Sequence, residues 1–130
     1  MITNKVKVLG IIFLVIGVLG FIPALAPQGM LLGIFEVDTV HNVVHLLSGI
    51  LALVFAARGT HMAQAFSKVF GIVYGLVAII GLMSPTVLGL FAVNGADNIL
   101  HILLAIIFLV LGFKKSHQKM AMPMQDHTTM

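Results

Sequence analysis

The sequence predicts an all-α integral membrane protein, a four-helix bundle built from a parallel two-helix repeat. Three observations support this fold class. Of the 130 residues, 60% are hydrophobic and only 8% are charged, whereas a typical soluble domain has about 25% charged residues. Apolar runs of near-spanning length occur four times, and the second half of the chain repeats the first. Each run is expected to be a helix, because backbone groups in hydrocarbon must be hydrogen-bonded within the spanning segment.

The first run could also be read as a cleavable leader, because it ends in an Ala24-Leu25-Ala26 triplet. Pro27 follows directly and fits a peptidase poorly, so we expect this helix to be retained. The third run is short and is expected to begin near Met62, with Lys68 reaching to the interface. The expected helices are about 8–26, 40–57, 62–83 and 97–113, in a single transmembrane domain of residues 1–119 before a disordered tail at 120–130.

Charged residues predict the orientation. The seven Lys and Arg residues lie in the N-terminal segment, the middle connection and the C-terminal tail, whereas Glu36, Asp38 and Asp97 fall on the opposite side. The positive-inside rule then predicts a multi-pass protein of the cell (inner) membrane with both termini cytoplasmic. No basic patch lies on a polar face, so lipid is the expected partner and nucleic acid is not. A homo-oligomer or a protein partner is left open.

The internal repeat is carried by polar, glycine and aromatic positions as well as by apolar ones. "KVLGIIF" from Lys7 aligns with "KVFGIVY" from Lys68 at an offset of 61. At an offset of 56 the identical pairs are Gly33/Gly89, Phe35/Phe91, Val37/Val93, Asn42/Asn98 and His45/His101. Each unit begins and ends on the same side, so the pseudo-two-fold axis is expected along the membrane normal.

These residues resemble a known family. A Gly-x-Phe-x-Val-Asp/Asn stretch leads into a helix bearing Asn-x-x-His, at Gly33–His45 and again at Gly89–His101. The pattern is similar to that of the small bacterial four-span membrane proteins of domain-of-unknown-function family 4383. The resemblance covers about Lys7 to Lys115, implies four spans and brings no assigned activity.

Polar residues recur on the second and fourth helices and define the candidate site. They are Asn42 and His45 on the second helix and Asn98 and His101 on the fourth. His45 and His101 share helical stripes with small residues, and small residues mark helix contacts in membranes, so both histidines are expected to face the bundle interior. His41 and Asp97 occupy equivalent positions about one turn further out. Asp38 and Asn94 are placed as helix N-caps, where a side-chain oxygen accepts a free N–H.

Two interpretations follow. In the first, Asn42, His45, Asn98 and His101 form structural polar pairs, and the cluster acts mainly as interhelical glue. In the second, His41, His45, Asp97 and His101 hold a divalent metal, or they serve a proton-responsive sensor or transporter component. A haem between His45 and His101 is a variant of the second interpretation. The first interpretation predicts no cofactor.

The remaining segments offer little chemistry. The two outer loops are too apolar to extend freely into water and are expected to lie in the interface, capping the bundle. Met and His residues of the tail are able to bind Cu(I), although an untethered tail is the simpler expectation. The chain has no cysteine, and no nucleophile–base pair or phosphate loop is evident, so the sequence predicts a small non-enzymatic membrane protein.

Overall fold

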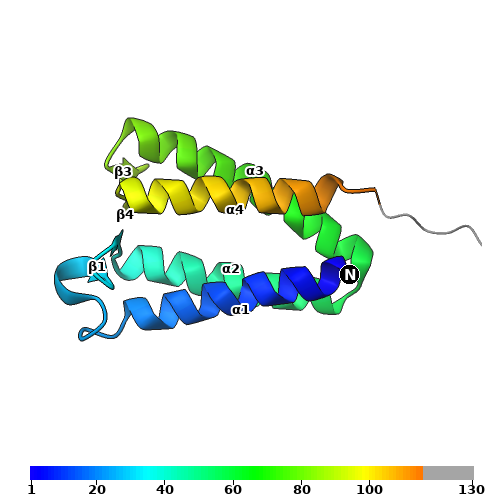
Figure 1. The fold of residues 1–130 in the computed structure, drawn as a ribbon, viewed down its shortest axis with the longest axis horizontal. Helices are drawn as coiled ribbons and strands as arrows, with labels where there is room; N and C mark the ends of the chain where they lie inside the picture. The colour runs from blue at the N-terminus through cyan, green and yellow to red at the C-terminus, as the bar shows by residue number, and fades with distance from the viewer. Residues whose placement is uncertain (116–130) are drawn as a thin grey trace, which may run out of the picture.

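Four long helices run side by side, with short hairpins at one end of the bundle (Figure 1). The computed structural model describes residues 1–115. The helices are α1 (Ile2–Gly20), α2 (Thr39–Ala57), α3 (Thr60–Met83) and α4 (Gly95–Phe113). Each is long and apolar enough to cross a membrane, since 19 residues span about 28 Å at 1.5 Å per residue. The expected tail at 120–130, with its Met and His residues, lies outside the described residues.

Three helices lie close to their expected positions, and the first is displaced. Residues 8–26 were expected to form this helix, but it occupies Ile2–Gly20 and is followed by the short 3₁₀ helix η1 (Pro27–Gly29). Polar residues before the apolar run are tolerated in the first turns because they lie at the interface. Pro23 follows three residues after the helix ends, where a proline disfavours further helix. The first apolar run is therefore part of the bundle and packs along α2.

The helices associate as two pairs, α1 with α2 and α3 with α4 (Figure 1). Small residues allow the closest approaches. A β-carbon added at Gly49 would lie 2.7 Å from the carbonyl oxygen of Gly10, and one added at Gly71 would lie 2.9 Å from the backbone nitrogen of Leu109. Gly75 completes a G-x-x-x-G pattern with Gly71, yet the nearest atom to a β-carbon there is 3.9 Å away. Only one glycine of that motif is required for packing.

The loop between α1 and α2 and the loop between α3 and α4 contain short strands that were not predicted from the sequence. Strands β1 (Met30–Leu31) and β2 (Phe35–Glu36) form one antiparallel hairpin, and β3 (Thr86–Val87) and β4 (Phe91–Ala92) form the other. The repeat extends into their turns, because Leu32 and Leu88 have φ values of 54° and 52°. The following glycines have φ values of 69° and 71°, so both central residues have positive φ, as in a type I′ turn. Two-residue strands are too short to give an alternating pattern.

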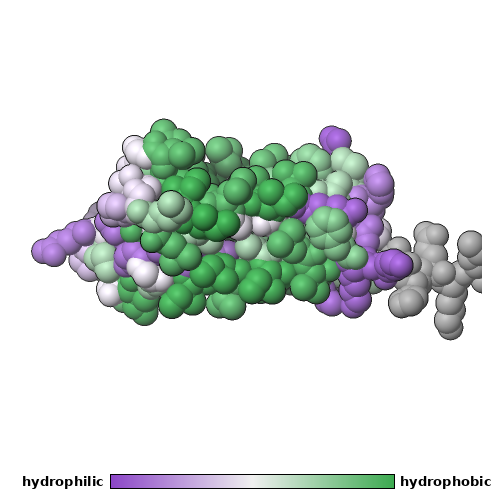
Figure 2. Space-filling model, turned by 90° about the horizontal axis from the view of Figure 1, so that it is seen from above, coloured by the Kyte–Doolittle hydropathy of each residue, from purple (hydrophilic) through white to green (hydrophobic). Residues whose placement is uncertain are grey.

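The surface is divided into an apolar band and two polar ends (Figure 2). The N-terminus, the α2–α3 connection and the end of α4 lie at one end, and both hairpins lie at the other (Figure 1). Each half therefore starts and finishes at the same end of the molecule, as a parallel repeat requires. The core between the two helix pairs is largely aromatic, with Phe13, Phe66 and Phe108 almost fully buried.

Candidate functional site

Three histidines meet in the hairpin-proximal part of the bundle. His41 and His45 lie on the first two turns of α2, and His101 lies on the second turn of α4. Their exposed fractions are only 1%, 3% and 1%. The helical spacing explains this burial, because His41 and His45 are four residues apart and share the stripe that faces the opposite repeat.

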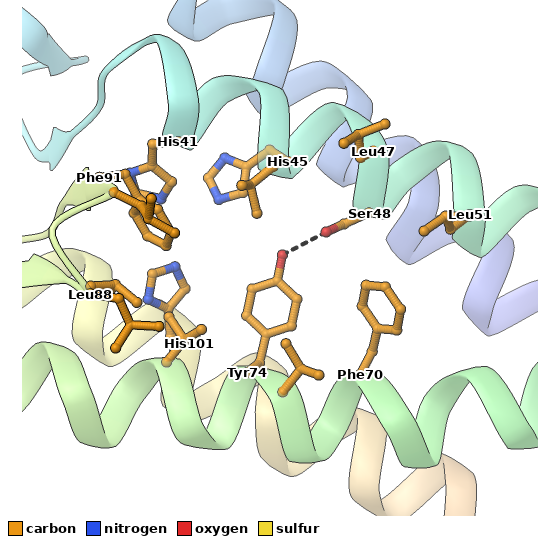
Figure 3. Close-up of a pocket in the computed structure, with 15 residues that line it drawn as sticks. His41, His45, Leu47, Ser48, Leu51, Phe70, Tyr74, Leu88, Phe91 and His101 are labelled. Atoms are coloured by element: carbon orange, nitrogen blue, oxygen red, sulfur yellow. Dashed lines mark hydrogen bonds between the residues drawn. The ribbon is translucent and has the colours of Figure 1, made fainter.

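The three imidazole rings converge on a common region (Figure 3). One ring nitrogen from each histidine lies within 4.8 Å of the other two. The ring centroids of His41 and His45 are 4.5 Å apart, and that of His101 lies 5.7 Å from His41 and 6.4 Å from His45. Aromatic side chains hold each ring from outside the cluster: Phe91 against His41, Phe13 against His45 and Tyr74 against His101.

Hydrogen bonding does not account for this cluster. Within residues 1–115, both ring nitrogens of His41 and Nδ1 of His45 and of His101 are buried without a hydrogen-bond partner. Such groups are unusual, since most buried polar atoms in folded proteins are satisfied. Among the described residues, no side-chain hydrogen bond of these histidines supports the interpretation of the cluster as interhelical glue.

Asp97 does not join the histidines, which corrects the expected four-residue metal set. Its Oδ2 accepts hydrogen bonds from the backbone N–H of Glu36 at 3.1 Å and of Asn94 at 2.9 Å. Its carboxylate thus serves the backbone at the entrance of α4, although the side chain is only 2% exposed. The group that could hold a metal is His41, His45 and His101 among the described residues.

The two helix caps lie at the expected positions. Asp38 accepts from the backbone N–H of His41 at 2.8 Å, and Asn94 accepts from that of Asp97 at 3.0 Å. Asp38 also reaches across the repeat, since its Oδ2 accepts from the backbone N–H of Ala92 at 2.8 Å. These bonds fix the first turns of α2 and α4, and hence the direction in which the histidines point.

The two asparagines contact helices of their own repeat rather than each other. Asn98 donates from Nδ2 to the carbonyl oxygen of Gly81 at 3.0 Å, which joins α4 to α3. Asn42 packs in the same way on Gly20, the repeat counterpart of Gly81. Asn98 therefore provides the interhelical bond that the glue interpretation expects, but it does so within a repeat.

A cavity of about 340 Å³ extends from the histidines between α2, α3 and the second hairpin. The hydroxyl groups of Ser48 and Tyr74 are 2.9 Å apart across its wall and form a hydrogen bond between the two repeats (Figure 3). Neither residue was predicted to belong to the site. A signal existed for Tyr74, because it is the only tyrosine and aligns with Phe13 in the repeat.

Comparison with known proteins identifies a family without an assigned role. The family described as "Domain of unknown function (DUF4383)" matches residues 5–114. The chain belongs to the DUF4383 family. No curated protein and no solved structure matches the chain. This DUF4383 protein is a four-helix multi-pass membrane protein in which both halves contribute to one buried histidine cluster.

Proposed function

We propose that this protein is a small non-enzymatic membrane protein that holds one divalent transition-metal ion on His41, His45 and His101. The observation that carries the proposal is the convergence of three buried imidazoles, four of whose six ring nitrogens are buried without a hydrogen-bond partner in the described chain. A buried polar group left unsatisfied costs about 1–3 kcal/mol. Coordination to a metal ion satisfies several such groups at once.

The donor set favours particular metals. Imidazole nitrogens suit zinc, copper, iron and nickel, whereas magnesium and calcium prefer oxygen ligands. Three protein ligands leave a fourth tetrahedral position for a small molecule, an arrangement typical of zinc sites that are not purely structural. The proposed ion is therefore able to exchange a ligand.

The three histidine nitrogens must move closer together to bind one ion. Zn–N bonds of 2.0–2.1 Å place tetrahedral nitrogens about 3.3 Å apart, whereas the histidine nitrogens lie within 4.8 Å of one another. Movement of each imidazole by about 1 Å toward the centre, through its χ angles, reaches that geometry. The backbone positions are fixed by the caps and need little change.

The location of the site supports binding or sensing rather than transport across the whole bundle. Below the histidines the core is closed by Phe13 and Phe108, which are 1% and 0% exposed. The positive-inside rule, applied to the Lys and Arg residues at the opposite end, supports a cytoplasmic location of both termini. The histidines then lie in the outer leaflet of the membrane.

Metal content of the purified protein tests the proposal. Protein prepared in detergent without chelators is expected to hold about one Zn²⁺ per chain after exposure to Zn²⁺ and removal of excess, measured by elemental analysis. His45→Ala and His101→Ala are expected to lose the ion. His61→Ala is the matched control, since His61 is exposed in the first turn of α3, at the end of the bundle opposite the hairpins.

Two results would overturn the proposal. One is a wild-type protein that is folded by circular dichroism yet retains no Zn²⁺, Cu²⁺ or Ni²⁺. The other is equal metal content in wild type, His45→Ala and His101→Ala. His45→Gln and His101→Gln add a further check, because glutamine keeps a hydrogen-bonding group and is a poor metal ligand. If both glutamine variants retain the ion, the histidines are not its ligands.

A further inference from the structure

The cavity beside the histidines has a polar end and an apolar body. His41, His45 and His101 line one end. The rest of the wall is mostly aliphatic and aromatic, apart from the hydrogen-bonded hydroxyl groups of Ser48 and Tyr74. A cavity of about 340 Å³ lies at the lower end of the range for small-ligand sites, near 300–1,000 Å³. Its shape suits a molecule with one polar group and an apolar tail.

The mouth of this cavity faces the bilayer. Leu47 and Leu51 of α2 and Val73 of α3 line it and are 54%, 39% and 43% exposed. These residues lie in the middle parts of α2 and α3, and the surface between the polar ends of the molecule is apolar (Figure 2). Leu88 and Leu90 of the second hairpin extend the apolar rim toward the outer end. A ligand that enters between these side chains comes from the lipid phase.

The two repeats differ where the cavity lies. Ser48 and Tyr74 line it, and their repeat counterparts are Leu104 and Phe13, which are buried in the core. The Leu104 and Phe13 pair is larger and wholly apolar. A pocket of about 370 Å³ on the α1–α4 side lies nearer the N-terminus, and its lining includes Leu9 and Ile107 but no histidine. Of these two cavities, the one beside α2 and α3 reaches the histidines and the two hydroxyl groups.

Charge determines the polar group of the ligand. Three neutral imidazoles around a divalent ion leave a net charge of +2 in the membrane. The carboxylates of Asp38 and Asp97 lie at the entrances of α2 and α4, but both accept hydrogen bonds from backbone N–H groups and neither belongs to the histidine group. A charge removed from water is strongly unfavourable unless it is paired. An anionic oxygen ligand in the fourth position supplies the missing negative charge.

We infer that the cavity binds a long-chain carboxylic acid taken up laterally from the bilayer, with its carboxylate on the metal held by the three histidines. The inference rests on the proposed metal site. The acid loses its proton to the aqueous interface as its carboxylate oxygen coordinates the ion. Its hydrocarbon chain lies between Leu47, Phe70 and Val73 and leaves the cavity toward lipid.

Fluorescence of Tyr74 provides a direct test, since the chain has one tyrosine and no tryptophan. Zn²⁺-loaded protein in phosphatidylcholine vesicles is titrated with dodecanoic acid brominated near its carboxyl end. Saturable quenching of Tyr74 is expected. The brominated alcohol of the same length should require about tenfold more ligand for half-quenching, and acetate should not compete. In protein stripped of Zn²⁺, the acid and the alcohol should reach half-quenching at the same concentration.

A pair of variants tests the route of entry. Val73→Phe narrows the mouth and is expected to weaken quenching by the acid about tenfold, with Zn²⁺ content unchanged. Ile12→Phe is the matched control at the equivalent position of α1, where the native side chain is 44% exposed. It is expected to leave quenching unaltered.

The outcomes separate the two proposals. Full Zn²⁺ content without saturable quenching by the acid overturns the carboxylate ligand and leaves the metal site standing. Equal quenching by the acid and the alcohol, or quenching unaffected by removal of Zn²⁺, also overturns it. Absence of Zn²⁺ binding overturns the metal site, and the ligand inference fails with it. Equal weakening by Val73→Phe and Ile12→Phe overturns entry between α2 and α3.

Discussion

The two repeats use the same helix entrance in different ways. In the first, the carboxylate is at the N-cap, Asp38, and the third helical position is His41. In the second, the N-cap is Asn94 and the carboxylate is at the third position, Asp97. Each carboxylate binds an N–H of the other repeat's hairpin, at Ala92 and Glu36 respectively. Because Asp38 does this from the cap, position 41 is free to carry a histidine into the core.

The departure from symmetry creates the site. If both repeats followed the pattern of the second, an acid would stand at both third helical positions, and only His45 and His101 would remain in the core. Moving one carboxylate by three residues keeps both hairpin bonds and adds a third imidazole. The same conclusion applies to Ser48 and Tyr74, which occupy the positions of Leu104 and Phe13.

Asp97→His gives the third helical position of α4 the residue that α2 has there. It is expected to lower the free energy of unfolding more than the other substitutions. It deprives the N–H groups of Glu36 and Asn94 of their acceptor, and hydrogen bonds to a charged group contribute about 1.5–3 kcal/mol each. The free energy of unfolding, from denaturant titration in detergent, should fall by about 3 kcal/mol. Asp97→Asn keeps one acceptor and should lose less. Normal stability of Asp97→Asn with loss of metal would instead make Asp97 a ligand.

Gly81→Ala compares the two asparagine contacts. An added methyl group would meet the Asn98 side chain and would lie 3.1 Å from Cγ2 of Val93, so the bond from Asn98 to the Gly81 carbonyl is expected to break. Thermal unfolding should report a loss of about 2 kcal/mol. Gly20→Ala, at the equivalent contact with Asn42, should cost less because no such bond is formed there in the described structure. Equal losses would show that crowding, not the hydrogen bond, dominates.

Asp38→Asn gives the first repeat the cap residue of the second. Asparagine caps helices as well as aspartate does, so the bond to the His41 N–H should persist. Asparagine has only one acceptor oxygen, so the second bond, from the Ala92 N–H, is lost, and a loss of about 1.5 kcal/mol is expected. Hydrogen exchange at Ala92 should rise while exchange at His41 stays protected. Faster exchange at both amides would mean that the charge itself holds the cap.

Tyr74→Phe gives the second repeat the aromatic residue of the first and is expected to have the smallest effect. It removes only the bond to Ser48, and such bonds between membrane helices average about 0.6 kcal/mol. Unfolding measurements on Tyr74→Phe and Ser48→Ala should agree within error, and the double variant should add little. Additive losses in the double variant would show that the two hydroxyl groups act separately.

The sequence predicted the features that depend on local pattern. Four apolar runs, the 56-residue repeat and the stripe that buries His41, His45 and His101 follow from composition and helical spacing. The caps at Asp38 and Asn94 follow from position alone. The start of α1 was misjudged, because polar residues at a helix end carry no hydrophobic signal.

Features that depend on contacts between the repeats were not predictable. Asp97 shares a helix face with His101, so spacing alone directed it to the site. Its carboxylate is instead taken by an N–H 61 residues away. The hydrogen bond between Ser48 and Tyr74 joins helices of different repeats. The repeat alignment distinguishes Tyr74 from Phe13, but it does not indicate Ser48 as the partner. Strands of two residues are too short to show an alternating pattern in the sequence, so they could not be predicted from it.

The exchanged hairpin bonds have a consequence for the order in which the chain is assembled. Before α4 has formed, the Glu36 N–H lacks the carboxylate that accepts its hydrogen bond, since Asp97 belongs to α4. The Asp38 carboxylate likewise lacks the N–H of Ala92 until the second hairpin has been made. The two entrances are therefore joined only after α4 follows the second hairpin, and the three histidines come into register at that stage.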